Sequence, residues 1–145
     1  MPVRLSALLV LVACANDGLE PPRGLSYAVA MRSCAPNDGP AVAIYLSAAP
    51  APGQEPAPPY LNISVWQPLS ALNGSWSVSS NSPQAVASYY SSGTNFEAAS
   101  EGTVTITSVS SDNTVTGSID ATFPNAGQVR GGFTARWLDR QILCG

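Results

Sequence analysis

The sequence contains no histidine and no lysine, so all 6 of its basic residues are arginines. Histidine is the side chain that most often acts as a general acid, a general base or a transition-metal ligand near neutral pH. Its absence excludes histidine-dependent catalysis, and the absence of lysine excludes lysine-activated serine chemistry. Charged residues are also scarce, at 10% of the chain with a net charge of -3, which is a poor match for nucleic-acid phosphates. We expect no nucleic-acid partner.

The chain is short, and its apolar residues are small. Its 145 residues fit one domain of ordinary size, and its 45% hydrophobic content is led by alanine and valine. Serine, threonine, glycine and proline make up much of the remainder. This balance favours a β-rich extracellular domain over a helical cytoplasmic one.

The amino terminus lacks an apolar run long enough to span a bilayer as a helix, which takes about 20 residues. Residues 1–13 instead combine one positive charge, Arg4, with a short apolar run and the small residue Ala13. This arrangement is typical of a secretory signal peptide. The sequence therefore predicts export of the chain.

The signal ends in Leu11-Val12-Ala13-Cys14, which resembles the lipobox of bacterial lipoproteins. The resemblance implies that Cys14 receives a thioether-linked diacylglycerol, becomes the first mature residue and is acylated further, for example with palmitate. Each buried methylene adds about 0.8 kcal/mol of membrane affinity, so such chains hold a domain at a bilayer. Because Ala15 is not acidic, the resemblance favours the outer membrane over the inner membrane.

Three cysteines would leave one thiol unpaired, but lipidation of Cys14 leaves the even pair Cys34 and Cys144. A disulfide between these two residues would close almost the whole domain. A redox-active pair is the alternative, yet the spacing is not Cys-x-x-Cys and no lysine or histidine is present to lower a thiol pKa. We therefore expect a structural disulfide between Cys34 and Cys144.

The mature chain divides into a flexible tether, residues 14–24, and a β domain, residues 25–145. Three short strands are expected in the first half of this domain, at residues 26–32, 40–47 and 60–66. An exposed extended loop, rich in alanine and proline, is expected at residues 48–59. Residues 69–80 and 82–92 have mixed spacing that does not decide between strand and helix.

Strict alternation of apolar and polar residues marks the last third of the chain. The alternating segments are residues 103–109, 114–123 and 128–137. Period-two alternation indicates strands with one buried and one solvated face, and short polar connections suit hairpins. These segments predict an antiparallel three-strand meander. The whole domain is predicted to be all-β, as a small antiparallel β-sandwich or flattened barrel.

Two glycines, Gly117 and Gly131, fall inside these strands, where they let a ring or a backbone come close or let the sheet bend. The pattern of these strands, followed by Cys144, resembles the carboxy-terminal part of small β-rich envelope lipoproteins whose role is uncharacterised. The resemblance implies no activity.

An enzyme without histidine would have to use carboxylates. Glu97, Glu101 and Asp120 are acidic residues of the folded half that do not fall in turns, and glycoside hydrolysis requires a carboxylate pair. Nothing in the sequence brings two of them together, so solvated side chains at strand edges are the favoured interpretation. The turn at Asp112 and Asn113 is not the alternating acidic loop of a calcium site. We expect no catalytic residue, no metal and no cofactor.

The aromatic residues offer a second kind of site, because their rings stack on sugars or contact a protein partner. Trp76 and Trp137 are predicted to supply bulk to the core. Tyr89 and Tyr90 are neighbours in one segment, and neighbours in a strand face opposite ways, so one of them should be exposed. The candidate contact residues are Tyr89, Tyr90 and Trp66.

These observations favour a lipid-anchored, non-enzymatic structural or interaction module of the cell envelope, with the membrane and an envelope protein or glycan as partners. Two alternatives stay open. A module that binds a carbohydrate or small apolar ligand requires Tyr89, Tyr90 or Trp66 to line an open concavity. A carboxylate-dependent hydrolase requires two of the candidate carboxylates to converge in a cleft.

Overall fold

The computed structural model describes residues 20–50, 55–82 and 84–145 of the chain. The predicted signal peptide, lipobox and Cys14 lie outside the described residues. Within them the chain forms nine strands in one sheet and no α-helix. The predicted all-β class is confirmed.

The elements follow the chain in a simple order. They are η1 (Pro22–Gly24, a 3-10 turn), β1 (Tyr27–Cys34), β2 (Pro40–Ser47), β3 (Tyr60–Val65), η2 (Leu69–Ala71, a second 3-10 turn), β4 (Gly74–Ser77), β5 (Ala85–Tyr90), β6 (Phe96–Ala98), β7 (Glu101–Val109), β8 (Val115–Phe123) and β9 (Gly127–Leu138). The strands expected in the first half and in the last third are all present. The undecided middle of the chain forms η2, β4 and β5.

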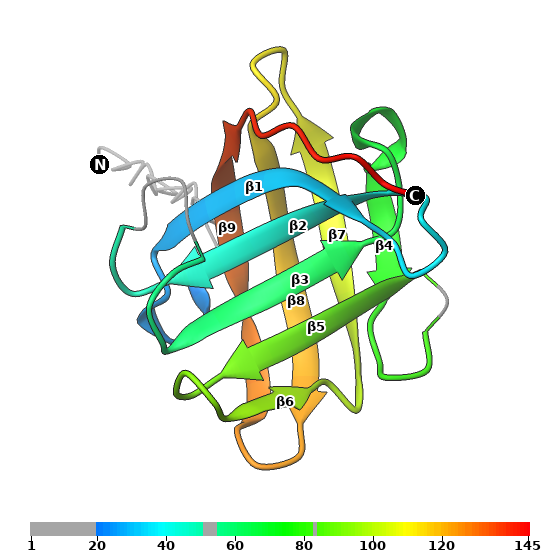
Figure 1. Ribbon diagram of the computed structural model, residues 1–145. Helices are drawn as coiled ribbons and strands as arrows, with labels where there is room; N and C mark the ends of the chain where they lie inside the picture. The colour runs from blue at the N-terminus through cyan, green and yellow to red at the C-terminus, as the bar shows by residue number, and fades with distance from the viewer. Residues whose placement is uncertain (1–19, 51–54, 83) are drawn as a thin grey trace, which may run out of the picture.

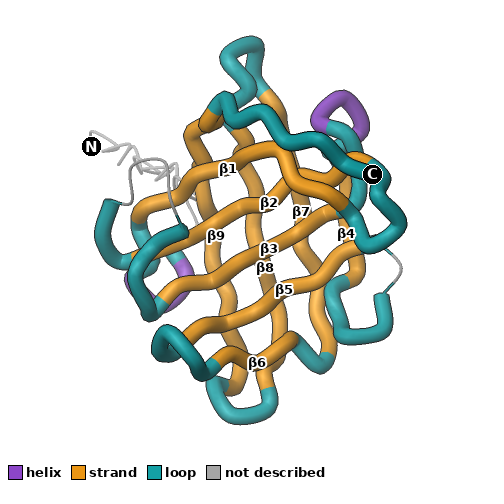
Figure 2. Tube along the Cα trace, viewed as in Figure 1, coloured by secondary structure: helices purple, strands orange, loops and turns teal. Residues whose placement is uncertain are grey.

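The sheet curls on itself into two layers that form a half-barrel. Its strand order is β4-β7-β8-β9-β1-β2-β3-β5-β6. Figure 1 shows β1, β2, β3, β5 and β6 in a front layer with β9, β8, β7 and β4 behind it, and Figure 2 shows the strands of the two layers crossing. All neighbouring strands are antiparallel except β1 and β9, which pair in parallel. This parallel pair joins the two layers and makes the sheet mixed rather than purely antiparallel.

A corner between β6 and β7 joins the layers a second time. The Ala99 N–H donates to the Ala87 carbonyl at 2.9 Å, and the next N–H, that of Ser100, donates to the Thr122 carbonyl at 2.8 Å. Consecutive residues therefore bond to β5 in the front layer and to β8 in the back layer. The chain changes layers here without a loop, which places β6 directly beside the turn between β8 and β9.

The predicted meander is formed by β7, β8 and β9. A Cβ atom at Gly117 would lie 2.3 Å from the Thr105 carbonyl oxygen and 3.0 Å from the Phe133 ring. At Gly131 it would lie 2.4 Å from the Glu20 carbonyl oxygen. The close approach expected at both glycines is confirmed.

Part of the segment predicted to be a flexible tether belongs to the fold. The Gly132 N–H donates to the Glu20 carbonyl at 3.0 Å, and the Arg23 guanidinium donates to the Ala126 carbonyl. These contacts fasten the incoming chain along β9, before β1 begins its own pairing with that strand. The described fold therefore includes residues 20–24.

The core lies between the two layers and is built from aliphatic side chains with few rings. The largest fully buried side chains include Phe123, Ile44, Leu46, Leu61, Ile63, Leu72 and Ile119. Trp76 and Trp137 pack against this core and are half-buried, in agreement with the prediction. The Trp76 indole N–H donates to the Leu72 carbonyl at 2.9 Å, which satisfies its polar atom.

The expected disulfide joins Cys34, at the end of β1, to Cys144, with 5.6 Å between the Cα atoms and a sequence separation of 110. It holds the C-terminal tail across the outer side of the front layer (Figure 1). Met31, Ala41 and Ala43 belong to β1 and β2 on this outer side, and all three are buried. These buried side chains lie at the end of the outer face that the tail crosses.

Candidate functional site

Four aromatic rings form a row on the outer face of the front layer. They come from four neighbouring strands: Tyr45 (β2), Tyr60 (β3), Tyr90 (β5) and Phe96 (β6). Tyr90 is the register partner of both Tyr60 and Phe96, so these side chains stand side by side. The ring centroids are 6.1 Å apart for Tyr45 and Tyr60, 4.4 Å for Tyr60 and Tyr90, and 5.2 Å for Tyr90 and Phe96. We call this row the aromatic ladder.

The aromatic ladder is buried in the middle of the sheet and open at the sheet edge. Tyr60 is 3% exposed, whereas Phe96 is 63% exposed. The Tyr60 hydroxyl donates to the Glu55 carboxylate, in the segment that leads into β3. Burial raises the pKa of Tyr60 far above its usual value, and the bond to Glu55 raises it further. Burial also raises the pKa of Tyr45, with the Glu55 carboxylate adding to the shift.

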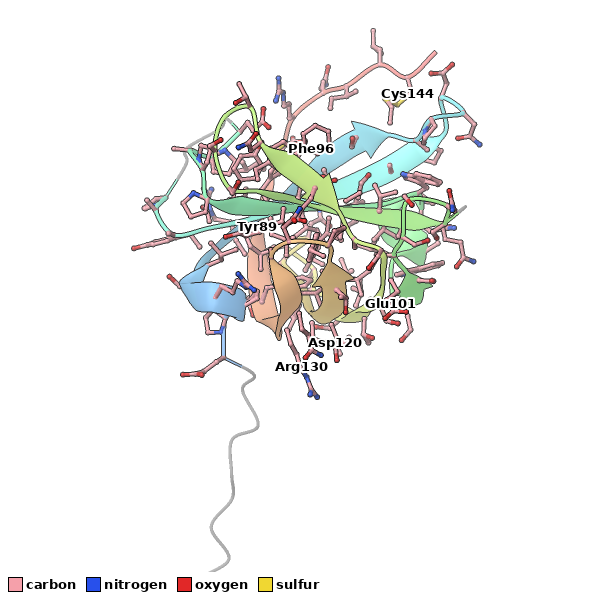
Figure 3. All side chains as sticks on the ribbon, turned by 90° about the horizontal axis from the view of Figure 1, so that it is seen from below. Tyr89, Phe96, Glu101, Asp120, Arg130 and Cys144 are labelled. Atoms are coloured by element: carbon pink, nitrogen blue, oxygen red, sulfur yellow. A yellow bond between two sulfur atoms is a disulfide. The ribbon has the colours of Figure 1, made fainter. Side chains whose placement is uncertain are left out.

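A cleft of about 390 Å³ lies at the open end of the ladder, and we call it the edge cleft. Its lining residues are Tyr89, Ser91, Asn95, Phe96, Glu97 and Asn125. They come from the edge of β5 and β6, from the turn that joins these strands and from the turn between β8 and β9. Figure 3 shows Phe96 and Tyr89 on opposite sides of the β5–β6 edge, so the cleft wraps around the end of the sheet.

Two sets of contacts hold the edge cleft in shape. The Glu97 carboxylate accepts hydrogen bonds from the backbone N–H groups of Asn125 and Ala126, each at 2.7 Å, and from the Asn125 side-chain amide at 3.3 Å. On the other side, stacking on Tyr90 fixes the plane of the Phe96 ring, with 22° between the two rings. The cleft is therefore organised before any ligand arrives.

The predicted contact residues fall in different places. Tyr90 belongs to the aromatic ladder and Tyr89 lines the edge cleft, and both are half-buried. The sequence predicts an exposed ring at either Tyr89 or Tyr90, and this prediction is wrong. Tyr90 is covered because Tyr60 and Phe96 stack on it, and the exposed ring is that of Phe96. Trp66 directly follows β3, at the opposite end of that strand from Tyr60. At 3.3 Å per residue the two residues are roughly 20 Å apart along the strand. Trp66 lies instead beside the turn after β1. Trp66 therefore does not join this site.

Two of the three carboxylates considered for a hydrolase, Glu97 and Asp120, have structural partners. Glu97 holds the turn between β8 and β9, as described above. Asp120 accepts from the Gln128 amide at 2.8 Å and lies 3.6 Å from Arg130 Nε. Glu101 is exposed at the start of β7. Figure 3 places Asp120, Arg130 and Glu101 on the side of the molecule away from Phe96.

The described residues contain no group of three or more potential metal-ligating side chains. Among the same residues, no helix has the length and hydropathy needed to cross a bilayer.

Sequence reasoning missed Tyr45 and Tyr60 as part of the site. Both residues fall in strands that were predicted, but their role depends on which strands are neighbours and in which register. One signal was present: Tyr45 alternates with Val42, Ile44 and Leu46, which face the core, so its ring has to point outward.

The chain matches no protein-family model, no curated protein and no solved structure at a significant level. The edge cleft and the aromatic ladder therefore have to be interpreted from their own chemistry.

Proposed function

We propose that this chain is a lipid-anchored module of the bacterial cell envelope that acts by binding a partner at the open end of the aromatic ladder. The observation that carries the proposal is Phe96, which is 63% exposed and yet held in a stack. An exposed ring contributes little to stability, because its apolar area is in water in both the folded and the unfolded chain. A ring that is already oriented loses little conformational entropy when a partner covers it.

Binding fits the chemistry of the described residues better than catalysis does. Both oxygens of Glu97 accept structural hydrogen bonds, and Asp120 accepts one from Gln128 and pairs with Arg130. The sequence has no histidine or lysine to activate a nucleophile. Binding on a rigid aromatic platform beside a small polar cleft needs neither a free carboxylate nor an activated nucleophile.

The cysteines support the anchor. The disulfide uses Cys34 and Cys144, which leaves Cys14 as the remaining one of the 3 cysteines in the sequence. Six peptide units separate Cys14 from Glu20, the first described residue, and span at most about 20 Å. A lipid on Cys14 would therefore keep the domain close to the bilayer, where its partner must also be found.

Intact mass of the protein purified from the membranes of a lipoprotein-competent bacterium tests the anchor. We expect a chain that starts at Cys14, carries acyl mass and takes up an alkylating reagent only after reduction. The matched control is Cys14→Ser, which should yield no acylated chain and should leave the disulfide intact. An unacylated wild-type chain retaining residues 1–13 would contradict the anchor.

A further inference from the structure

The lining of the edge cleft combines one exposed ring with small polar side chains. Phe96 offers the ring, Asn95 and Asn125 offer amides, and Ser91 offers a hydroxyl. At about 390 Å³ the cleft is near the lower limit of ligand pockets, which run from roughly 300 to 1,000 Å³. This size suits a small ring or the end of a chain rather than a folded domain.

The ring provides a flat apolar platform. One face of Phe96 stacks on Tyr90, so the π-system that remains open belongs to the other face. Pyranose sugars whose hydroxyls are all equatorial carry their axial C–H groups on the two ring faces. Such C–H groups are attracted to the negative face of an aromatic ring.

The amides supply donors and acceptors beside this platform. Within the described residues, the Asn95 side chain takes part in no hydrogen bond, and the Asn125 amide uses only its nitrogen, toward Glu97. An amide offers one acceptor and two donors, which match the neighbouring hydroxyls of a sugar. The neighbouring Ser91 hydroxyl makes only a long bond, 3.4 Å, to the Asn95 carbonyl.

The charges point to a neutral ligand. The described lining of the cleft includes the Glu97 carboxylate and no basic side chain. The nearby Arg23 is not among the lining residues: it donates to the Ala126 carbonyl and lies 5.7 Å above the Tyr89 ring. An acidic sugar or a phosphate in the cleft would meet the Glu97 carboxylate, whereas no basic side chain lines the wall.

We propose that the edge cleft binds one unit of a neutral glycan whose pyranose hydroxyls are equatorial, with the sugar stacked on Phe96 and its hydroxyls bonded to Asn95 and Asn125. The proposal rests on the proposed function and names the class of its partner. Glucosyl chains and N-acetylglucosaminyl chains share this chemistry, so both are used as probes.

Calorimetric titration of the detergent-solubilised full chain with cellotetraose and with chitotetraose tests the proposal. We expect millimolar binding of at least one tetrasaccharide. Tighter binding of chitotetraose would show that the cleft contacts the acetamido group. Phe96→Ala should weaken binding about tenfold, Asn95→Ala about fivefold, and Phe96→Trp should retain it. The matched control is Tyr27→Ala, because Tyr27 is an exposed ring, 46% accessible, on β1 and outside the cleft.

Three outcomes would overturn the glycan site. The folded wild-type chain binds neither tetrasaccharide up to about 20 mM, Phe96→Ala binds as well as the wild type, or Tyr27→Ala loses as much affinity as Phe96→Ala. Each outcome is independent of acylation at Cys14, which the mass measurement reports. Failure of the sugar site and failure of the anchor are thus distinguishable.

Discussion

The outer face of the front layer is treated differently at its two ends. Over β1 and β2 it carries small or pliable side chains, Met31, Ala41 and Ala43, and lies under the C-terminal tail that the disulfide holds. Over β5 and β6 it carries the rings of Tyr90 and Phe96. The comparison teaches that one face of a single layer can be buried beside a disulfide-held tail at one end and keep an exposed ring at the other.

Loss of the disulfide should have the largest effect. In the Cys34→Ser, Cys144→Ser double variant, the unfolded chain regains the entropy of a loop that spans 110 residues. We expect the free energy of unfolding to fall by about 4 to 5 kcal/mol, as measured by urea denaturation. A loss below about 1 kcal/mol would contradict the stabilisation assigned to this cross-link.

Tyr60 should come next, because it is the buried member of the aromatic ladder. Tyr60→Ala removes a ring that is 3% exposed and should cost about 3 kcal/mol in urea denaturation. The matched variant Tyr60→Phe keeps the ring, loses only the bond to Glu55 and should cost about 1 kcal/mol or less. Equal losses in the two variants would mean that the hydroxyl, and not the ring, stabilises the ladder.

Alkaline pH should destabilise the wild type through the same residue. The pKa of Tyr60 is raised in the folded state, so its stabilising contribution is complete below the unfolded pKa of about 10. That contribution is lost as the pH rises from there through the folded pKa, because the unfolded chain releases the proton first. Denaturation at about pH 9 and pH 11 should show a smaller decrease for Tyr60→Phe than for the wild type. An identical decrease would contradict the raised pKa.

Phe96→Ala should have the smallest effect on stability. The Phe96 ring is 63% exposed, and substitutions at such positions usually change the free energy of unfolding by less than about 0.5 kcal/mol. Thermal or urea denaturation checks this expectation. A loss of about 2 kcal/mol or more would make Phe96 a structural residue and would remove the contrast between the two ends.

The sequence predicts local features of this fold well. The alternation over residues 103–137 identifies β7, β8 and β9, and the strands expected at residues 26–32 and 40–47 correspond to β1 and β2. Both features involve neighbours in the chain, where hairpins follow from spacing and turn residues. The disulfide follows from the cysteine count once Cys14 is set aside.

The candidate site depends on pairing between distant segments, and the sequence does not specify that pairing. The parallel contact of β1 with β9 and the corner at Ala99 and Ser100 decide how the two layers meet. The aromatic ladder depends on β5 pairing with β3 while β4, between them in the chain, pairs with β7 in the other layer. The edge cleft depends on β6 meeting the distant turn between β8 and β9. Parallel pairs need long crossover connections that leave no local signature.

Photo-crosslinking in living cells tests the central claim most directly. A benzoylphenylalanine in place of Phe96 should form an adduct with an envelope component, and one in place of Tyr27 should not, although both rings are exposed. Analysis of the adduct mass then tells whether the component is a glycan or a protein. No adduct at position 96, or equal adducts at both positions, would contradict a binding role for the open end of the aromatic ladder.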